Sequence, residues 1–272
     1  MCGSGWRHRM PPPKPCRSIR PMNVQTTLTP AEFDGIMSAD LPETACVVFD
    51  ILRATSTFVT ALHEGAKEII AVREIAEAVI FLEKREDILL AGERDGVKIS
   101  AARSGGKDFD LGNSPREFVR KKIEGRTIVS TTTNGTRALR ACAGAKTVLV
   151  ASLLNLAATA DFLRQKDFAE VLLVCAGTGQ NAALEDILAA GAMAELLAAR
   201  GLARTPFPDA TEAARRTYLQ VLPEFDSVFD QTLNARRLRA IPELEADVAF
   251  CRQRDVFPVV GVMGVDGAIR KA

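Results

Sequence analysis

Histidine is scarce in this chain of 272 residues, which contains only His8 and His63. Without a set of imidazoles the sequence offers no zinc site of the usual kind, and triad or phosphohistidine chemistry would depend on His63 alone. His63 lies in a segment with a helical pattern, and we interpret it as a residue of the helix surface.

The sequence also lacks closely spaced cysteine motifs and long apolar runs. The six cysteines show no CxxC spacing, and four of them lie in apolar or Ala-rich surroundings that are typical of reduced, buried thiols. No apolar run approaches the roughly 18 residues of a membrane helix, and the start of the chain lacks the apolar region of a secretory signal. We therefore expect a cytoplasmic protein with no disulfides and no membrane partner.

Net charge is also small, at a formal +1. The first 21 residues hold five basic residues and no acid, and subtracting these five charges leaves residues 22–272 with a net charge of −4. Nucleic-acid binding requires a basic face, so we exclude a nucleic-acid partner. Because residues 1–21 are rich in proline and lack apolar periodicity, we predict a disordered tail there and a single folded domain over residues 22–272.

Short apolar runs alternate with longer helical patterns over this domain. Near-continuous Val, Ile and Leu in the short runs indicates strands that are covered on both faces. The sequence therefore predicts a three-layer α/β/α fold with a mostly parallel sheet. The strand candidates are residues 45–50, 68–72, 88–93, 126–132, 147–152, 170–177 and 256–263, and the later helix candidates are residues 182–202, 209–225 and 232–253.

Two segments of the chain resemble each other. Residues 47–72 and 127–152 each run through a strand, a polar loop, a helix, the tripeptide Gly-Ala-Lys and a second strand. Two similar lobes with equivalent polar loops would produce this pattern, and so would any two unrelated βαβ units. The sequence leaves both interpretations open.

Ligands of open α/β sheets bind beyond the carboxyl ends of the strands, so the polar segments that follow the apolar runs are the candidate sites. These segments are residues 50–57, 92–98, 130–137 and 175–186. In the third, threonine hydroxyls, Gly135 and Arg137 at a helix start would suit an anion. The alternative is simple N-capping of that helix by Thr133 or Asn134.

Acidic residues occur in the same polar segments. Glu185 and Asp186 would complement a helix dipole by roughly 0.3–1 kcal/mol. Alternatively, they would hold Mg²⁺ together with Asp50 and Glu93, because this ion prefers one or two carboxylates plus substrate oxygens and water. An anion site beside spare carboxylates predicts a metal-assisted phosphate site.

Other designs fit the sequence less well. Residues 177–182 match the G-x-G-x-x-A form of a dinucleotide fingerprint, but no second strand ending in an acid follows about 20 residues on, which argues against a nicotinamide or flavin site. The chain contains no C-x5-R phosphatase motif and no Walker A motif, and Asp50 does not begin a D-x-D nucleophile motif.

Five ordered segments together closely resemble the 2-phosphosulfolactate phosphatase family: residues 47–69, 92–99, 109–118, 127–139 and 174–192. The resemblance makes residues 22–272 a phosphatase domain. It implies Mg²⁺-dependent hydrolysis of the phosphate ester of 2-phospho-3-sulfolactate, a step toward coenzyme M, or of a related phosphorylated 2-hydroxy acid. The competing class is a non-catalytic protein that binds a small phosphorylated or sulfonated acid.

The resemblance also implies roles for individual residues. Asp50, Arg53 and Glu185 are the expected catalytic residues, and Asp50, Glu93, Glu185 and Asp186 are the expected ligands of Mg²⁺. Substrate contacts are expected from Thr55, Ser56, Thr57, Arg94, Lys98, Asn113, Ser114, Thr132, Thr133, Asn134, Gly135, Thr136, Arg137, Gly177 and Thr178.

Some questions stay open at this point. The sequence does not choose between metal-positioned water and Asp50 as the nucleophile. Asp95 and Ala235 stand where the family commonly has glycine, which leaves the loop after Glu93 and a C-terminal ligand contact in question. A homodimer is the base-rate expectation for such an enzyme.

Overall fold

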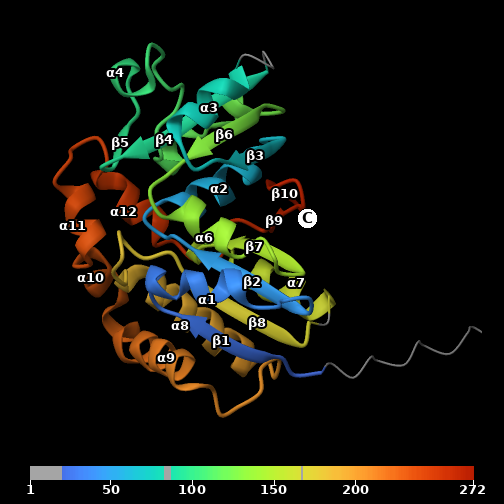
Figure 1. Ribbon diagram of the computed structural model, residues 1–272. Helices are drawn as coiled ribbons and strands as arrows, with labels where there is room; N and C mark the ends of the chain where they lie inside the picture. The colour runs from blue at the N-terminus through green and yellow to red at the C-terminus, as the bar shows by residue number, and fades with distance from the viewer. Residues whose placement is uncertain (1–19, 83–86, 167) are drawn as a thin grey trace, which may run out of the picture.

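The computed structural model describes residues 20–82, 87–166 and 168–272 (Figure 1). All but the last two positions of the predicted tail, residues 1–21, lie outside the described residues. The described chain is built around a ten-stranded sheet. None of the helices in these ranges is long and apolar enough to span a membrane.

The strands follow the spatial order β1-β8-β2-β7-β9-β10-β3-β6-β4-β5. Their bounds are β1 (Asn23–Thr27), β2 (Thr44–Phe49), β3 (Glu68–Ala71), β4 (Ile88–Arg94), β5 (Val97–Lys98), β6 (Thr127–Thr131), β7 (Thr147–Ala151), β8 (Glu170–Cys175), β9 (Gly261–Met263) and β10 (Ala268–Lys271). The mostly parallel α/β fold predicted from the sequence is confirmed.

Two parallel sets of strands make up most of the sheet, and a hairpin joins them. Strands β1, β8, β2 and β7 are parallel to one another, as are β3, β6 and β4. Between the sets, β9 and β10 pair antiparallel with each other, β9 pairs antiparallel with β7, and β10 pairs antiparallel with β3. The two sets are therefore halves of one continuous sheet.

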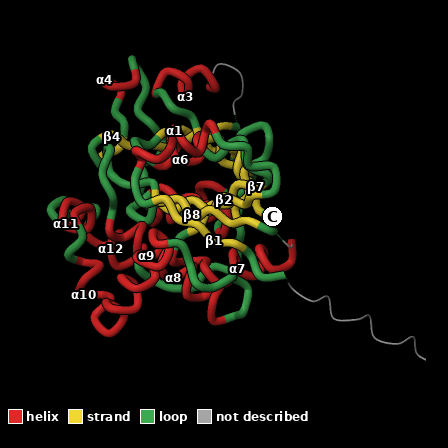
Figure 2. Tube along the Cα trace, turned by 60° about the horizontal axis from the view of Figure 1, so that its bottom comes forward, coloured by secondary structure: helices red, strands yellow, loops and turns green. Residues whose placement is uncertain are grey.

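Helices cover both faces of the sheet. Figure 2 shows α7, α8 and α9 on one side of β1, β2 and β8, and α1 and α6 on the other. The α-helices are α1 (Phe33–Ser38), α2 (Ala54–His63), α3 (Ile75–Leu82), α4 (Ala101–Ser104), α5 (Arg120–Ile123), α6 (Gly135–Ala141), α7 (Leu156–Lys166), α8 (Leu184–Ala199), α9 (Asp209–Val221), α10 (Phe225–Asp230), α11 (Leu233–Arg239) and α12 (Glu245–Cys251). Short 3₁₀ helices span Pro30–Glu32, Pro115–Glu117, Leu153–Asn155 and Leu222–Glu224.

Strand β2 contributes side chains to the hydrophobic cores on both faces of the sheet. Successive side chains of a strand point to opposite faces, so Val47 and Phe49 enter one hydrophobic core while Cys46 and Val48 enter the other. All six residues of the strand are buried. This double burial accounts for the continuous apolar runs from which the strands were predicted.

The two similar segments of the sequence cross between the halves of the sheet in opposite directions. The unit β2–α2–β3 leads from the first half to the second, and β6–α6–β7 leads back. The first turns of α2 and α6 consequently lie against each other, and a Cβ atom on Gly135 would be 2.6 Å from the Cβ of Ala54. The polar loops of the two units therefore meet.

The structure differs from the sequence prediction in two respects. All seven predicted strands contain a strand, but β1, β5 and β10 were not predicted because they are short or rich in polar residues. The helix predicted over residues 232–253 is divided into α11 and α12. Pro242 lies in the break, where it lacks the N–H group that a continuous helix would need.

A glycine sets the contact between α8 and α9. A Cβ atom on Gly191 would lie 2.2 Å from the carbonyl oxygen of Ala214 and 2.9 Å from the Cβ of Tyr218. Because these two helices would have to separate, Gly191→Ala is expected to destabilise the protein by about 1–3 kcal/mol, measured by urea unfolding. Gly144→Ala is the control, since nothing lies within 4 Å of its added Cβ. Equal stability of the two variants would contradict this account.

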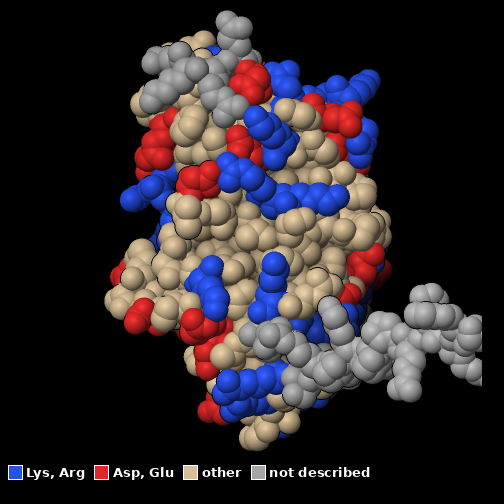
Figure 3. Space-filling view, turned by 90° about the vertical axis from the view of Figure 1, so that its right-hand side faces the viewer, with Lys and Arg blue, Asp and Glu red and all other residues tan. Residues whose placement is uncertain are grey.

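Figure 3 shows the side of the molecule at the right of Figure 1. Acidic and basic side chains are interspersed there, and a broad uncharged band crosses the middle. The described residues of this face form no continuous basic field of the kind that nucleic acids require.

Candidate active site

A cavity of about 510 Å³ lies beyond the carboxyl ends of β2, β4, β6 and β8. Residues that follow these four strands form one wall, and α11 with the segment after it forms another. The lining residues are Asp50, Leu52, Arg53, Glu93, Asp95, Gly96, Asn113, Thr132, Thr133, Asn134, Gly177, Thr178, Gly179, Asn234, Arg237, Leu238 and Ile241.

The twist of the sheet brings these strand ends together. Three successive antiparallel pairings separate β7 from β3, so in a flat sheet the ends of β2 and β4 would lie at opposite edges. Each pairing adds roughly 20–25° of twist, which accumulates to roughly 100° or more over the five pairings between β2 and β6. The cavity therefore depends on the twist of the whole sheet, because strands on both sides of the hairpin contribute to its lining.

The turn between β2 and α2 is closed by its own hydroxyl groups. The Thr55 hydroxyl donates to the carbonyl oxygen of Asp50 and accepts from the Asp50 N–H, both at 3.0 Å. The hydroxyl of Ser56 donates to the Ile51 carbonyl at 2.9 Å, and that of Thr57 donates to the Asn113 carbonyl at 2.8 Å. These three residues are buried and hold the turn in place, and their predicted contact with substrate stays a prediction.

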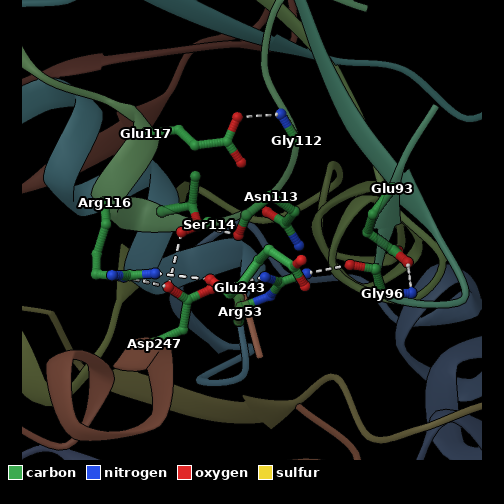
Figure 4. A network of polar contacts seen from close by, with 11 residues as sticks. Arg53, Glu93, Gly96, Gly112, Asn113, Ser114, Arg116, Glu117, Glu243 and Asp247 are labelled. Carbon is green, nitrogen blue, oxygen red and sulfur yellow. Dashed lines mark hydrogen bonds and ion pairs between the residues drawn. The ribbon is translucent and has the colours of Figure 1, made fainter. Parts of the chain in front are cut away.

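Arg53 is fixed in the cavity wall by a buried ion pair (Figure 4). Its Nη1 donates to Asp247 Oδ2 at 2.7 Å and its Nη2 donates to the Gly96 carbonyl at 2.6 Å. The other carboxylate oxygen of Asp247 accepts from Ser114 Oγ at 2.7 Å and from Arg116 Nε at 2.8 Å. With 2% and 0% of their side chains exposed, Arg53 and Asp247 hold α12 against the turn after β2.

Glu93 and Asp186 each bind backbone N–H groups of neighbouring loops. Glu93 Oε1 accepts from both the N–H and the hydroxyl of Thr133 at 3.0 Å, and Oε2 accepts from the Gly96 N–H at 2.8 Å. Asp186 Oδ1 accepts from the Ile51 N–H at 2.8 Å and Oδ2 from the Gly177 N–H at 2.9 Å. Both carboxylates therefore join loops from different strands.

Asp50 and Glu185 keep one carboxylate oxygen free. Asp50 Oδ1 accepts from the Ala54 N–H at 3.1 Å, and no hydrogen bond from the described residues reaches its Oδ2. Glu185 Oε1 accepts from Asn234 Nδ2 at 2.6 Å, and its buried Oε2 has no hydrogen-bond partner in the described part of the chain. A buried oxygen without a partner is costly, so a ligand that supplied the missing contact would be stabilised at this position.

The electrostatics of this group favour a cation. Burial raises the pKa of Asp50 to about 7, and the negative charges of Glu93 and Glu185 add to the effect. Burial also raises the pKa of Glu185, and burial together with the charges of Asp50 and Glu185 raises the pKa of Asp186 well above its usual range. A bound cation would favour the ionised forms of these carboxyl groups.

The donor set fits a hard cation that shares its coordination with a ligand. No three Asp, Glu, His or Cys side chains within residues 20–82, 87–166 and 168–272 could hold a metal ion by themselves. Among the four predicted metal ligands, Asp50 and Glu185 nevertheless each keep one carboxylate oxygen without a hydrogen bond from the described residues. Mg²⁺ commonly binds one or two carboxylates and completes its shell with phosphate oxygens and water.

The loop after β6 contributes most of the other predicted contacts. Thr132, Thr133 and Asn134 line the cavity, and Asn134 Nδ2 donates to the Ala176 carbonyl at 2.9 Å, which ties this loop to the end of β8. A Cβ atom on Gly135 would lie 2.8 Å from Asp50 Oδ2, so only glycine leaves that oxygen accessible. The Thr136 hydroxyl donates to the Thr132 carbonyl within the helix.

Four other residues predicted to contact substrate lie outside the lining of the main cavity. Arg94 donates to the Arg73 carbonyl and to Thr131 Oγ1, and Arg137 donates to the Gly179 carbonyl. Neither arginine is a lining residue of the main cavity. Lys98 lines a neighbouring cavity of about 310 Å³, and Ser114 contacts Asp247. In contrast Asn113, Gly177 and Thr178 line the main cavity, and their contact with substrate stays a prediction.

The site residues that α11 and α12 contribute were not predicted from the sequence. Asn234 Nδ2 contacts both Thr178 Oγ1 and Glu185 Oε1 at 2.6 Å. Asn234, Leu238 and Ile241 recur at spacings of four and three residues, a helical pattern that marks one face but gives no hint of the cavity. Asp95 has φ of 58°, a left-handed conformation that Asp tolerates, so this departure from glycine keeps the turn.

The fold and the cavity together define an α/β protein with a cavity at the carboxyl ends of its strands, which is where ligands of open α/β sheets bind. The family model of 2-phosphosulpholactate phosphatase matches residues 31–265. The chain therefore belongs to the 2-phosphosulfolactate phosphatase family.

Individual relatives agree with this assignment. The chain is 39% identical over 232 residues to a probable 2-phosphosulfolactate phosphatase of Caldanaerobacter subterraneus subsp. tengcongensis, covering 84% of this chain and 91% of that protein. It is 40% identical over 214 residues to the protein of the same name from Thermotoga maritima, covering 79% and 86%. The Deinococcus radiodurans relative is 42% identical over 169 residues, covering 62% and 67%.

Proposed function

We propose that this phosphatase hydrolyses the phosphate ester of 2-phospho-3-sulfolactate, or of a related phosphorylated 2-hydroxy acid, and that it requires Mg²⁺. The observation that carries the proposal is the pair of buried carboxylates, Asp50 and Glu185, each with one free oxygen. Asp50 lines the cavity, and Glu185 lies behind the lining, where it is hydrogen-bonded to the lining residue Asn234. The names of the relatives support the substrate.

Asp50 and Glu185 would hold the metal ion. When bound, Mg²⁺ supplies positive charge that stabilises a phosphate group while its ester bond breaks. Glu93 and Asp186 would position the site and would not bind the metal ion directly, since their carboxylate oxygens accept hydrogen bonds from the backbone of loops beside the cavity. Arg53, held by Asp247, places a fixed positive charge in the same wall as Asp50, in the turn after β2.

Asp50 is suited to take part in the reaction itself. A pKa of about 7 lets this carboxyl group exchange a proton near neutral pH, and its Oδ2 is free to contact a phosphate or a water molecule. Two roles are compatible with this position: direct attack on phosphorus, and activation of a water molecule. Both require Asp50 to be ionised, which the approach of a cation favours.

Release of phosphate tests the proposal directly. The full-length protein, incubated with 2-phosphosulfolactate and Mg²⁺, is expected to release inorganic phosphate, to stop when EDTA is added and to recover with excess Mg²⁺. Release that continues at full rate in EDTA would remove the metal from the proposal. A folded protein that binds the acid without releasing phosphate would instead favour a binding protein.

A further inference from the structure

Two cationic side chains line the main cavity, and they differ in what they contact. The guanidinium of Arg53 is committed to Asp247 and Gly96. Arg237 is exposed, and it makes neither an ion pair nor a hydrogen bond with any residue in the described part of the chain. Arg237 is thus a positive charge at the cavity that is free to bind a ligand.

The placement of Arg237 follows from the way α11 is anchored. Asn234, three residues earlier, is hydrogen-bonded to Thr178, which lines the cavity, and to Glu185, which is buried behind the lining. Residues three and four positions apart share one face of a helix, so the anchor at Asn234 turns Arg237 and Leu238 toward the cavity. Arg236 and Arg239 are not among the lining residues, and Arg239 pairs with Asp230.

The two walls of the cavity have different chemistry. Asp50 and Glu93 lie on the wall formed by the strand ends, where the proposed metal ion and phosphate would bind. The α11 wall presents Arg237 together with the apolar side chains of Leu238 and Ile241. A ligand that spans the cavity would place its phosphate group at the strand-end wall and its other end near the guanidinium of Arg237.

We propose that Arg237 binds the second anionic group of the substrate, a sulfonate or a carboxylate, and so selects phosphorylated acids over phosphate esters with an uncharged remainder. This inference rests on the proposed function, because it assumes that phosphate occupies the acidic wall. Guanidinium groups suit this role, since their planar array of donors matches the oxygens of both groups.

Calorimetry with two probes separates this role from the phosphatase activity. Both titrations are carried out in the presence of Mg²⁺. The first probe, 3-sulfolactate, carries the sulfonate and the carboxylate but no phosphate ester. The second probe, inorganic phosphate, carries neither the sulfonate nor the carboxylate. In Arg237→Gln, the Kd for 3-sulfolactate is expected to rise by roughly 10- to 100-fold, since a charge-assisted hydrogen bond contributes about 1.5–3 kcal/mol. The Kd for inorganic phosphate should change by less than about twofold.

Arg236→Gln is the matched control, because it removes an equal charge from the neighbouring position of the same helix. It should leave both dissociation constants unchanged. An unchanged Kd for 3-sulfolactate in Arg237→Gln, or an equal loss in Arg236→Gln, overturns the proposal. Failure of the phosphatase assay in the wild-type protein would instead count against the proposed function, and the calorimetric comparison would still decide the role of Arg237.

Steady-state kinetics provides the second measurement. With 2-phosphosulfolactate, Arg237→Gln is expected to raise KM by roughly 10- to 100-fold and to change kcat little, because the contact is made equally before and during the reaction. A fall in kcat at constant KM would place Arg237 in the chemical step and contradict a role in recognition alone.

Discussion

Asp50→Asn is expected to abolish phosphate release. The same substitution is expected to make the metal-free protein more stable to unfolding at pH 8. The loss of activity should be at least about 10³-fold, because the amide supplies neither a nucleophile nor a base and binds a cation poorly. The gain in stability has a separate origin. The carboxyl group of Asp50 is buried among Glu93 and Glu185, and an amide in its place carries no charge.

The pH dependence follows from the two pKa values. The pKa of the Asp50 carboxyl group is near its ordinary value of 3.8 in the unfolded chain, and burial raises this pKa to about 7 in the folded protein. Between these values the folded state holds more protons than the unfolded state, so the free energy of unfolding falls as the pH rises from about 4 to about 7. The total effect is on the order of a few kcal/mol. Asp50→Asn should remove this part of the slope.

Thermal unfolding in EDTA between pH 5 and pH 8 measures the effect. Asp95→Asn is the control, because Asp95 lines the same cavity but its side chain is 80% exposed, and its profile should match that of the wild type. Addition of Mg²⁺ at pH 8 should raise Tm more in the wild type than in Asp50→Asn. Parallel pH profiles for Asp50→Asn and the wild type would show that Asp50 is not the group responsible.

Asp247→Ala is expected to be the most destabilising single change at the site. The carboxylate is completely buried and accepts hydrogen bonds from Arg53, Ser114 and Arg116. Its removal leaves the buried guanidinium of Arg53 without a counter-charge, which typically costs about 3–5 kcal/mol. Activity should fall as well, because Arg53 loses the contact that fixes it in the cavity wall.

Urea unfolding distinguishes this effect from a general loss of surface charge. Arg116→Gln removes the partly exposed partner of the same aspartate and should cost less than about 1 kcal/mol. The double variant Arg53→Met/Asp247→Leu should recover much of the stability without recovering activity, since an apolar pair of similar size needs no counter-charge. A cost below about 1 kcal/mol for Asp247→Ala would contradict the importance of the buried pair.

Local sequence patterns were enough to locate one wall of the cavity. Asp50, Glu93 and Thr132–Asn134 lie at or just beyond the ends of predicted strands, and the carboxyl ends of parallel strands collect ligand-binding loops. The pattern could not say which hydroxyl groups are used by the chain itself. Thr55 looks like an anion donor in the sequence, yet its hydroxyl bonds to the backbone of Asp50.

The opposite wall depends on contacts that no local pattern encodes. Asp247 reaches Arg53 across 194 positions of the chain, and Asn234 reaches Glu185 across 49. The sequence around Asn234 and Arg237 shows only an amphipathic, basic helix, whose docking site is set by tertiary packing. The expected homodimer stays a prediction.

The hairpin of β9 and β10 has a consequence for how the protein is made. These two strands lie in the middle of the sheet but are translated after all the others. At about 5–20 residues per second, the ribosome needs roughly 5–20 s to proceed from Ala151, at the end of β7, to Gly261. During that interval β3 and β7 present open edges that invite wrong pairing. The nascent chain acquires its cavity only when the hairpin emerges and closes both edges.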